Sequence, residues 1–265
     1  GMLARYGRRV LVLESHSRLG GAAHGYEKDG FKFDTGPSFF CGMQEEGSLN
    51  PLKMLMDALD ERVDYVPYDK FVFHFPSENR TLPIFGDYDK YLYSVSKLTK
   101  TGGAQMKNFG FEMQRLYDAM EGIPTIALRA DLQMVPRLFT RYAPTMLKML
   151  PYARSVQGPV QNFIDRAGVT DPFVQRLLDI ECFLLSGLKA DETIAAEIAF
   201  MFGERNLRKV EYPLGGAEAI VEAMARGIEK FGGELRTRAH VDKVIVESGK
   251  ARGVTLRSGE EIRAR

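Results

Sequence analysis

The sequence predicts an α/β protein in which a nucleotide-binding domain is interrupted by a mostly helical insertion. Three observations indicate this class. Residues 10–13 (VLVL) form an apolar run without alternation, typical of a strand covered on both faces in a parallel sheet, and Glu14 follows directly. Residues 88–202 are apolar mainly at helical spacing. Residues 234–265 read as short strands that turn at glycines.

The N-terminal segment predicts part of a dinucleotide-binding unit. A helix over residues 3–6 should end at Gly7, and the strand at 10–13 then places Glu14 where a carboxylate accepts hydrogen bonds from the ribose hydroxyls of an adenine nucleotide. The phosphate-binding glycines of such a unit lie about 20 residues before this acid. Only 13 residues precede Glu14, so we expect the first strand and the phosphate loop to be absent.

A glycine pair and a DTGPS sequence make the pattern more specific. Gly20 and Gly21 let the backbone approach a phosphate or a flavin without an intervening side chain. The stretch GGAAHGYEKDGFKFDTGPS (20–38) resembles the FAD-binding region of the flavin amine oxidase and phytoene desaturase superfamily, in particular its carotenoid isomerase branch, whose relatives include retinol saturases. Many members carry arginine where this chain has Ala22, so no guanidinium contact to the diphosphate is expected there. The resemblance implies FAD contacts from Glu14, Gly20, Gly21, Asp34, Gly36, Pro37 and Ser38.

Composition excludes several function classes. The 36 basic residues balance 35 acidic ones, so no global field attracts nucleic acid. The two cysteines have no C-x-x-C spacing, the four histidines have no metal-ligand spacing, and no G-x-S-x-G elbow or P-loop is present. We therefore expect no metal site and no hydrolase chemistry. No apolar run approaches the roughly 18 residues that span a bilayer, so any membrane contact should be peripheral.

The middle of the chain predicts one hairpin and a series of helices. A helix with proline in its first turn is expected at 51–61, and two strands at 68–76 and 80–85 should pair as a hairpin. Glycines then separate five further helical segments, at 88–98, 105–120, 132–150, 160–167 and 172–186.

One section of this helical region is basic and amphipathic. No acidic residue lies between Asp131 and Asp165, while four cations are spread among apolar side chains, at Arg137, Arg141, Lys148 and Arg154. A segment of this kind can lie in the plane of an anionic bilayer. The alternative is a solvated helix face over an ordinary core.

The stretch 177–187 (LLDIECFLLSG) places Glu181 in the middle of a mostly apolar helix. An unpaired buried carboxylate is costly, so Glu181 should have either a buried partner or a chemical role. The isomerase branch has a similar E-C-F run. The resemblance implies that Glu181 and Cys182 face the substrate cavity, with Glu181 as a candidate catalytic residue; a structural hydrogen bond is the alternative.

The C-terminal part predicts a helix followed by a β-meander. Apolar residues at i, i+3, i+4 and i+7 indicate a helix over 217–231, which Gly232 and Gly233 end. The preceding sequence YPLGG resembles the superfamily segment that positions substrate near the flavin, which implies substrate contacts from Tyr212, Gly215 and Gly216. By the same resemblance, the backbone of Val241 should hydrogen-bond the adenine edge of FAD.

The resemblance implies an incomplete Rossmann-like FAD/NAD(P)-binding domain with an inserted helical substrate domain and a β-meander. Residues 1–86 would form the first FAD-binding part with some substrate-domain strands, 87–206 a helical substrate and membrane-associating domain, and 207–265 the second FAD-binding part. The expected function is an FAD-dependent oxidoreductase or isomerase acting on a carotenoid or similar polyene, with NAD(P) as a candidate reductant. The protein would bind FAD, line an apolar tunnel and exclude water.

Two other functions stay open on the sequence alone. A retinol-saturase or amine-oxidase-like flavoenzyme would act on a different lipid or an amine. A non-catalytic fragment would bind a hydrophobic ligand or nothing, and we expect this chain alone to be inactive because the family's phosphate loop and flavin-ring segment fall outside it. The resemblance implies a peripheral membrane location, in a plastid if the source is a photosynthetic eukaryote and otherwise on the cytoplasmic face of a bacterial membrane. The oligomeric state is open.

Overall fold

The computed structural model describes residues 1–37, 39–121, 136, 140–207 and 209–264. Ser38 and, within the predicted helix at 132–150, residues 132–135 and 137–139 therefore lie outside the described residues. The chain divides into two compact units. Unit 1 comprises Gly1–Phe40, Leu52–Val66 and Tyr212–Arg265, and unit 2 comprises Cys41–Pro51 and Pro67–Glu211. The predicted hairpin, with strands at 68–76 and 80–85, thus belongs to unit 2. The functional roles assigned to the three predicted segments stay predictions.

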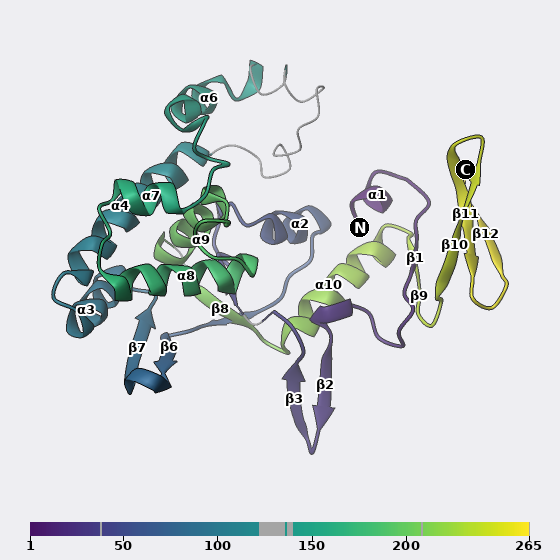
Figure 1. Cartoon of the computed structure of the whole chain (residues 1–265). Helices are drawn as coiled ribbons and strands as arrows, with labels where there is room; N and C mark the ends of the chain where they lie inside the picture. The colour runs from purple at the N-terminus through teal and green to yellow at the C-terminus, as the bar shows by residue number, and fades with distance from the viewer. Residues whose placement is uncertain (38, 122–135, 137–139, 208, 265) are drawn as a thin grey trace. The chain divides into compact units, whose positions relative to one another are not determined.

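A short parallel pair of strands lies at the centre of unit 1 (Figure 1). Strand β1 (Leu11–Leu13) pairs with β9 (Glu234–Arg236), and helix α1 (Met2–Arg5) precedes it. Gly7 has φ of 76°, which confirms the expected left-handed residue after the helix. The strand is confirmed, but its burial is not, because Leu11 is 38% exposed. Among the described residues β1 has a single neighbouring strand, which leaves its apolar run partly uncovered.

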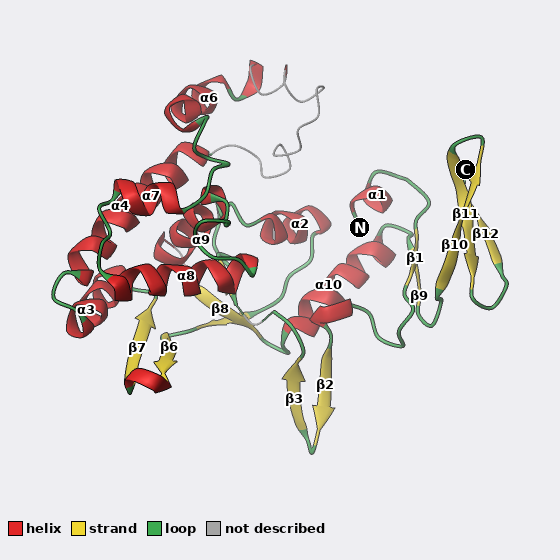
Figure 2. Cartoon of the chain, in the orientation of Figure 1, coloured by secondary structure: helices red, strands yellow, loops and turns green. Residues whose placement is uncertain are grey.

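The other strands that lie wholly in unit 1 form a hairpin and a three-stranded antiparallel meander (Figure 2). Strands β2 (Gly25–Lys28) and β3 (Phe31–Asp34) form a hairpin. Its two turn residues, Asp29 and Gly30, have φ of 54° and 79°, as two-residue hairpin turns require. Strands β10 (Val241–Glu247), β11 (Lys250–Leu256) and β12 (Glu261–Arg263) form the predicted meander in the order β10-β11-β12.

Helix α10 (Ala217–Lys230) is the long helix of unit 1. Its buried positions, among them Ile220, Ala223 and Gly227, follow the predicted helical spacing. Helix α2 (Pro51–Leu59) packs against it, and a Cβ at Gly227 would lie 3.0 Å from the Cβ of Leu59. Glycine at this position therefore lets the two helices approach closely.

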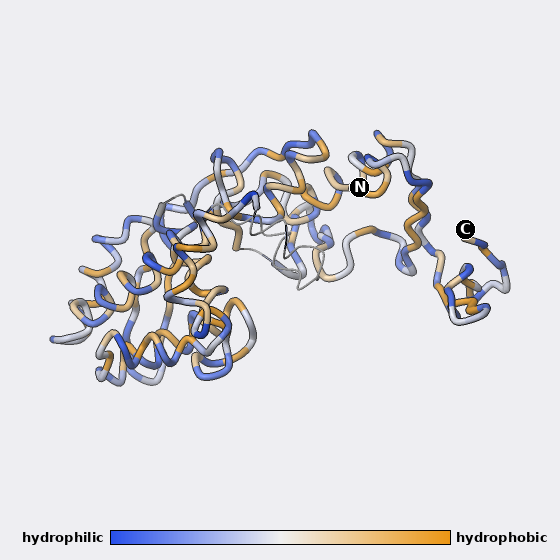
Figure 3. Tube along the Cα trace, turned by 90° about the horizontal axis from the view of Figure 1, so that it is seen from above, coloured by the Kyte–Doolittle hydropathy of each residue, from blue (hydrophilic) through white to orange (hydrophobic). Residues whose placement is uncertain are grey.

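Unit 2 is mostly helical, as the sequence predicts. Hydrophobic residues recur at intervals along its helices (Figure 3) and form one core of buried side chains. Helix α9 is not predicted by the sequence as a separate element. The helices are α3 (Tyr88–Leu98), α4 (Gly102–Met120), α6 (Ala143–Met149), α7 (Gln161–Arg166), α8 (Pro172–Ser186) and α9 (Ala195–Leu207), and the strands of the hairpin are β6 (Lys70–Phe75) and β7 (Arg80–Phe85).

A further small sheet and short 3-10 turns complete the described elements. The sheet has the order β4-β8-β5, formed by β4 (Phe40–Cys41), β8 (Val210–Pro213) and β5 (Tyr65–Pro67). The turns are η1 (Gly21–Ala23), η2 (Pro76–Glu78) and η4 (Leu150–Tyr152).

Two buried carboxylates hold the loop at 41–50 within unit 2. Glu204 of α9 accepts hydrogen bonds from the Ser48 hydroxyl at 2.8 Å, the Leu49 N–H at 2.8 Å and the Tyr117 hydroxyl at 2.7 Å. Glu211 of β8 accepts the Met43 N–H at 2.7 Å. Because all these partners are donors, they replace the water that each carboxylate loses on burial.

We expect Glu204→Gln to lower the free energy of unfolding by about 1–3 kcal/mol, because the amide supplies one acceptor oxygen where the carboxylate supplies two. Urea unfolding followed by circular dichroism measures this loss. Asp191→Asn, a neutralising change at an exposed position of the same unit, should shift the midpoint little. Equal stability of the wild type and Glu204→Gln would contradict the role given to this acid.

Candidate functional site

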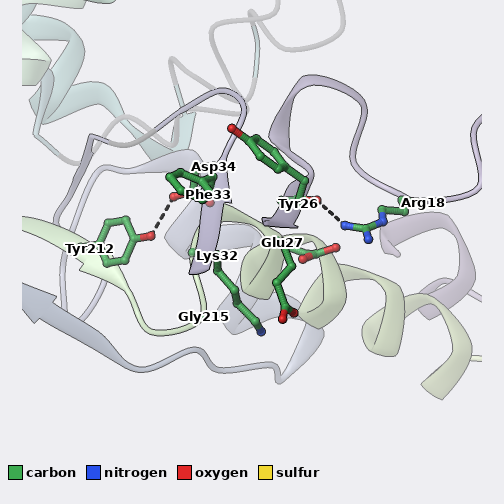
Figure 4. Close-up of a pocket in the computed structure, with 11 residues that line it drawn as sticks. Arg18, Tyr26, Glu27, Lys32, Phe33, Asp34, Tyr212 and Gly215 are labelled. Atoms are coloured by element: carbon green, nitrogen blue, oxygen red, sulfur yellow. Dashed lines mark hydrogen bonds between the residues drawn. The ribbon is translucent and has the colours of Figure 1, made fainter. Parts of the chain in front are cut away.

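A cavity of about 370 Å³ in unit 1 brings together four predicted site residues from two distant stretches of the sequence (Figure 4). Asp34 comes from the end of β3, Tyr212 from β8, and Gly215 and Gly216 from the turn before α10. The other lining residues are Arg18, Gly25, Tyr26, Glu27, Lys32, Phe33 and Glu218.

Asp34 uses both carboxylate oxygens within the protein. Its Oδ2 accepts the Tyr212 hydroxyl at 2.9 Å, and its Oδ1 accepts the N–H of Ala217, the first residue of α10, at 2.9 Å. A helix N-terminus favours an anion because its N–H groups point outward and its dipole is positive there. Asp34 therefore takes the position at which this helix could otherwise bind a phosphate.

Gly216 makes that contact possible. Its φ is 80°, and a Cβ at this position would lie 2.5 Å from Asp34 Oδ1. A side chain would thus be strained and would push the carboxylate away from the helix. The substrate contacts predicted for Tyr212, Gly215 and Gly216 stay predictions. In the structure, Tyr212 and Gly216 hold the Asp34 carboxylate in position.

Arg18 is a lining residue that sequence reasoning missed. Its Nη1 donates to the carbonyl of Gly25 at 2.5 Å, which ties the loop before the glycine pair to strand β2. The sequence feature that could have identified Arg18 is its place two residues before Gly20. Many members of the resembled superfamily carry an arginine directly after the second glycine instead. The rings of Tyr26 and Phe33, two further lining residues, stack with centroids 5.2 Å apart. The lining therefore combines aromatic faces with charges of both signs.

Glu14 lies at the end of β1, as predicted, and is exposed. Its N–H donates to the Arg236 carbonyl at 2.9 Å, which continues the β1–β9 pairing. Its Oε1 accepts the His16 N–H at 2.7 Å and the Ser15 hydroxyl at 3.2 Å. The bond from His16 lowers the pKa of Glu14 below its usual value, so the carboxylate is ionised at neutral pH. It does not line the cavity around Asp34.

The structure brings Glu14 close to the start of β10. The N–H of Ala239 donates to the Glu14 carbonyl at 2.8 Å, and Val241 follows two residues later. On one side Val241 pairs with Leu256 of β11. The opposite edge of β10 has no partner strand among the described residues, so its backbone groups can reach a ligand.

The predicted glycines have different local roles. Gly20 has φ of 109°, and a Cβ there would lie 2.9 Å from the Val221 side chain of α10, so this glycine packs against the helix. A Cβ at Gly36 would lie 2.1 Å from the Ala22 carbonyl oxygen. Gly21, with φ of 55°, has no atom within 4 Å of its Cβ position and is open to a ligand.

The other residues of the DTGPS sequence lie near Gly36 in the chain, and one of them also bonds the segment before β2. Thr35 Oγ1 donates to the carbonyl of His24 at 2.7 Å, which joins the residues after β3 to those before β2. Pro37 is exposed, and Ser38 lies outside the described residues. Their predicted FAD contacts stay predictions.

Glu181 and Cys182 are buried in the core of unit 2, whereas the resemblance implied that they face a cavity. Glu181 is 2% exposed, and its Oε1 accepts the Tyr91 hydroxyl at 2.8 Å and Arg205 Nη1 at 3.2 Å. Burial raises the pKa of the Cys182 thiol to about 12. The next two residues, Phe183 and Leu184, are the exposed ones. A substrate or catalytic role for Glu181 and Cys182 stays a prediction that the described contacts do not support.

The Glu181–Arg205 pair leaves three buried polar atoms without a partner among the described residues, namely Glu181 Oε2 and Arg205 Nε and Nη2. The guanidinium instead lies 4.4 Å from the centroid of the Phe202 ring and 5.1 Å from that of Tyr91. Such cation–π contacts offset part of the cost of burying the charge. The buried partner expected from the sequence is therefore Arg205, assisted by Tyr91.

The described residues contain no group of three potential metal-ligating side chains in suitable proximity. The helices of the described ranges include none that is both long and apolar enough to cross a bilayer.

Comparisons with known proteins agree with this architecture. The sequence pattern of the family described as "Flavin containing amine oxidoreductase" matches residues 2–265. The chain is 30% identical to the chloroplastic prolycopene isomerase of Daucus carota over 99% of its length, and 26% identical to the all-trans-retinol 13,14-reductase of Macaca fascicularis over 98%. It covers 42% of each of those proteins.

A solved structure shows the same mixed α/β fold. An oxidoreductase from Methanosarcina mazei superposes with a TM-score of 0.60 at 18% identity, over 99% of this chain and 53% of that one. The family match extends over nearly every described element, and it confirms the resemblance on which the FAD expectation rested. The chain belongs to the flavin-containing amine oxidoreductase family.

Proposed function

We propose that this chain is part of an FAD-dependent oxidoreductase or isomerase that acts on a carotenoid or a similar polyene lipid. The observation that carries the proposal is the likeness to a prolycopene isomerase along 99% of this chain. Because the chain spans about two fifths of that relative, the activity, the substrate and the location are proposals about the whole protein.

The residues of unit 1 fit the adenosine part of FAD. Glu14 is ionised, and its Oε2 forms no hydrogen bond with any residue that the structure describes, so it can accept from ribose hydroxyls. The free edge of β10 beginning at Val241 can bond the adenine, and the space at the Cβ position of Gly21 is open. Flavin would supply hydride transfer, and the protein would bind, orient and exclude water.

We assign no general base to the cavity around Asp34. Both oxygens of this acid are occupied by Tyr212 and by the α10 N-terminus, so its role is to position the turn at 213–216. This agrees with a flavin-centred reaction, in which the cofactor carries the chemistry and side chains provide its surroundings.

A second candidate is reduction of a retinoid. It is favoured by the likeness to an all-trans-retinol 13,14-reductase, which also extends over 98% of this chain. The unit 1 residues described above serve either reaction. Product analysis of the whole protein with a poly-cis carotene and with all-trans-retinol, each with and without NAD(P)H, separates the two candidates.

We also propose a peripheral membrane location. Leu147 and Leu150 are 66% and 65% exposed, and Lys148 lies between them in the sequence, on α6. Apolar side chains beside cations are the combination that binds an anionic lipid surface. The predicted contributions of Arg137, Leu138 and Phe139 lie outside the described residues.

FAD binding tests the role of Glu14. We expect Glu14→Ala to weaken binding about tenfold or more, because hydrogen bonds from ribose hydroxyls to a charged acceptor are lost. Quenching of flavin fluorescence on titration with the protein measures the affinity. Glu229→Ala, at another exposed acid of unit 1, is the control. The titration uses the whole protein: its failure to bind FAD would contradict the cofactor proposal, and equal affinity of the wild type and Glu14→Ala would remove Glu14 from the site.

Stability tests the role of Asp34. We expect Asp34→Ala to lower the free energy of unfolding by about 1–3 kcal/mol, because it removes the acceptor of two hydrogen bonds, one of them from the first N–H of α10. Tyr212→Phe removes one of these bonds and should cost less. Urea unfolding gives both values, and amide exchange at Ala217 reports the bond to the helix directly. An equal loss in the two variants would mean that the bond to Ala217 contributes nothing.

Vesicle sedimentation tests the membrane proposal. We expect the chain to bind vesicles containing phosphatidylserine, to bind neutral vesicles less, and to dissociate as salt is raised. The double variant Leu147→Asp, Lys148→Glu should lose binding, whereas Lys28→Glu in unit 1 should keep it. Indifference to vesicle charge, or unchanged binding by the double variant, would refute a role for α6.

A further inference from the structure

A second cavity, of about 540 Å³, lies in unit 2 at the C-terminal end of α8. Its volume falls within the range of about 300–1,000 Å³ that small-molecule sites occupy. Most lining side chains are apolar. The lining residues are Pro51, Met120, Leu185, Ser186, Leu188, Glu192, Thr193, Ile194, Ala196, Glu197 and Phe200. We call this the α8 groove.

The loop that forms one wall of the α8 groove is held in place by hydrogen bonds. Helix α8 ends at Ser186, and the following Gly187, with φ of 74°, turns the chain back. Asp179 Oδ1 then accepts the Ala190 N–H at 3.0 Å, and the carbonyl of Thr193 accepts the Val160 N–H at 2.9 Å. Because the wall is fixed in this way, Leu188 and Ile194 stay exposed instead of collapsing into the core. A pre-formed apolar site of this kind binds without a large ordering cost.

The hydroxyl groups of the α8 groove are already bonded. The hydroxyls of Ser186 and Thr193 lie 2.7 Å apart, and Ser186 also donates to the carbonyl of Cys182 at 3.0 Å. They therefore need no polar partner from a ligand. The lining offers an occupant mainly apolar contact.

Charge at the α8 groove has a single sign. Glu192 and Glu197 are its charged lining residues, and both are exposed. Neither carboxylate forms a hydrogen bond or an ion pair with another residue in the part of the chain that is described. A carboxylate or phosphate bound here would meet two uncompensated negative charges.

We propose that the α8 groove binds the hydrocarbon chain of a ligand that has no anionic group, and that Glu192 and Glu197 exclude anionic lipids. The proposal rests on residues of unit 2 alone and does not depend on FAD. The proposed site selects ligands by their charge as well as by their hydrocarbon chain. Ligands with a neutral head group would therefore bind, and fatty acids would not.

Displacement of the neutral dye Nile red by decanol, decylamine and decanoate tests the proposal on the chain as it is. The three competitors share one hydrocarbon tail and differ in head-group charge. We expect decanol and decylamine to displace the dye, and decanoate to need about tenfold higher concentration because of repulsion from the two acids. Higher salt should reduce this difference.

Variants test whether Glu192 and Glu197 cause the preference for decanol over decanoate. The double variant Glu192→Gln, Glu197→Gln should bring decanoate to the level of decanol. Asp191→Asn, at a neighbouring acid that does not line the groove, should leave the tenfold ratio unchanged. Leu188→Gln should weaken all three competitors together, whereas Val246→Gln in unit 1 should not.

Three results would overturn the proposal: equal displacement by decanol and decanoate in the wild type, a ratio that the double variant leaves intact, or no displacement by any competitor. Circular dichroism checks that each variant is folded. If Leu188→Gln fails to fold, the charge variants still decide the question, because they lie at exposed positions. None of these outcomes bears on FAD binding, so failure here is distinct from failure of the proposed enzyme function.

Discussion

The arrangement of unit 1 depends on the two hydrogen bonds of one carboxylate. Asp34 at the end of β3 bonds the hydroxyl of Tyr212, 178 residues further along the chain, and the first N–H of α10. These bonds join the hairpin β2–β3 to the turn before the long helix and so define two walls of the Asp34 cavity. The helix dipole strengthens the bond to Ala217, because the carboxylate lies at its positive end. A residue whose sequence context suggested contact with a cofactor thus acts first as a link within the protein.

Six glutamates of this chain differ in burial and in the partners of their carboxylate oxygens. Glu181, Glu204 and Glu211 are buried and accept hydrogen bonds from the protein, since a carboxylate that leaves water must replace its lost hydrogen bonds; among the described residues only Oε2 of Glu181 lacks such a donor in this group. Glu14, Glu192 and Glu197 are exposed, and each keeps at least one oxygen free of donors from the described part of the chain. The first group fixes loops and helices. The second group can act on ligands, by accepting hydrogen bonds from a ribose or by repelling anions.

The two proposed ligand surfaces differ in chemistry. In unit 1, the segments around Glu14 and Val241 and the Asp34 cavity offer charges, backbone groups and stacked rings, which suit a polar cofactor with an aromatic head. In unit 2, the α8 groove offers hydrocarbon contact and a negative rim, which suit an uncharged chain. A flavoenzyme that acts on a polyene needs both kinds of surface, and each can be tested without the other.

The sequence by itself determined the local elements of the fold. Strand β1 with Glu14 at its end, helix α10 and the C-terminal meander all follow from periodicity or from turn residues within a few positions. The family resemblance was also readable, because it rests on a contiguous stretch of 19 residues, GGAAHGYEKDGFKFDTGPS. Only the tertiary structure decided which polar groups meet. The Arg205 partner of Glu181 lies 24 residues away and the Tyr91 partner 90, and no local pattern specifies such pairs. The physical reason is that an apolar run fixes the type of an element, whereas the direction of each side chain depends on what packs against that element.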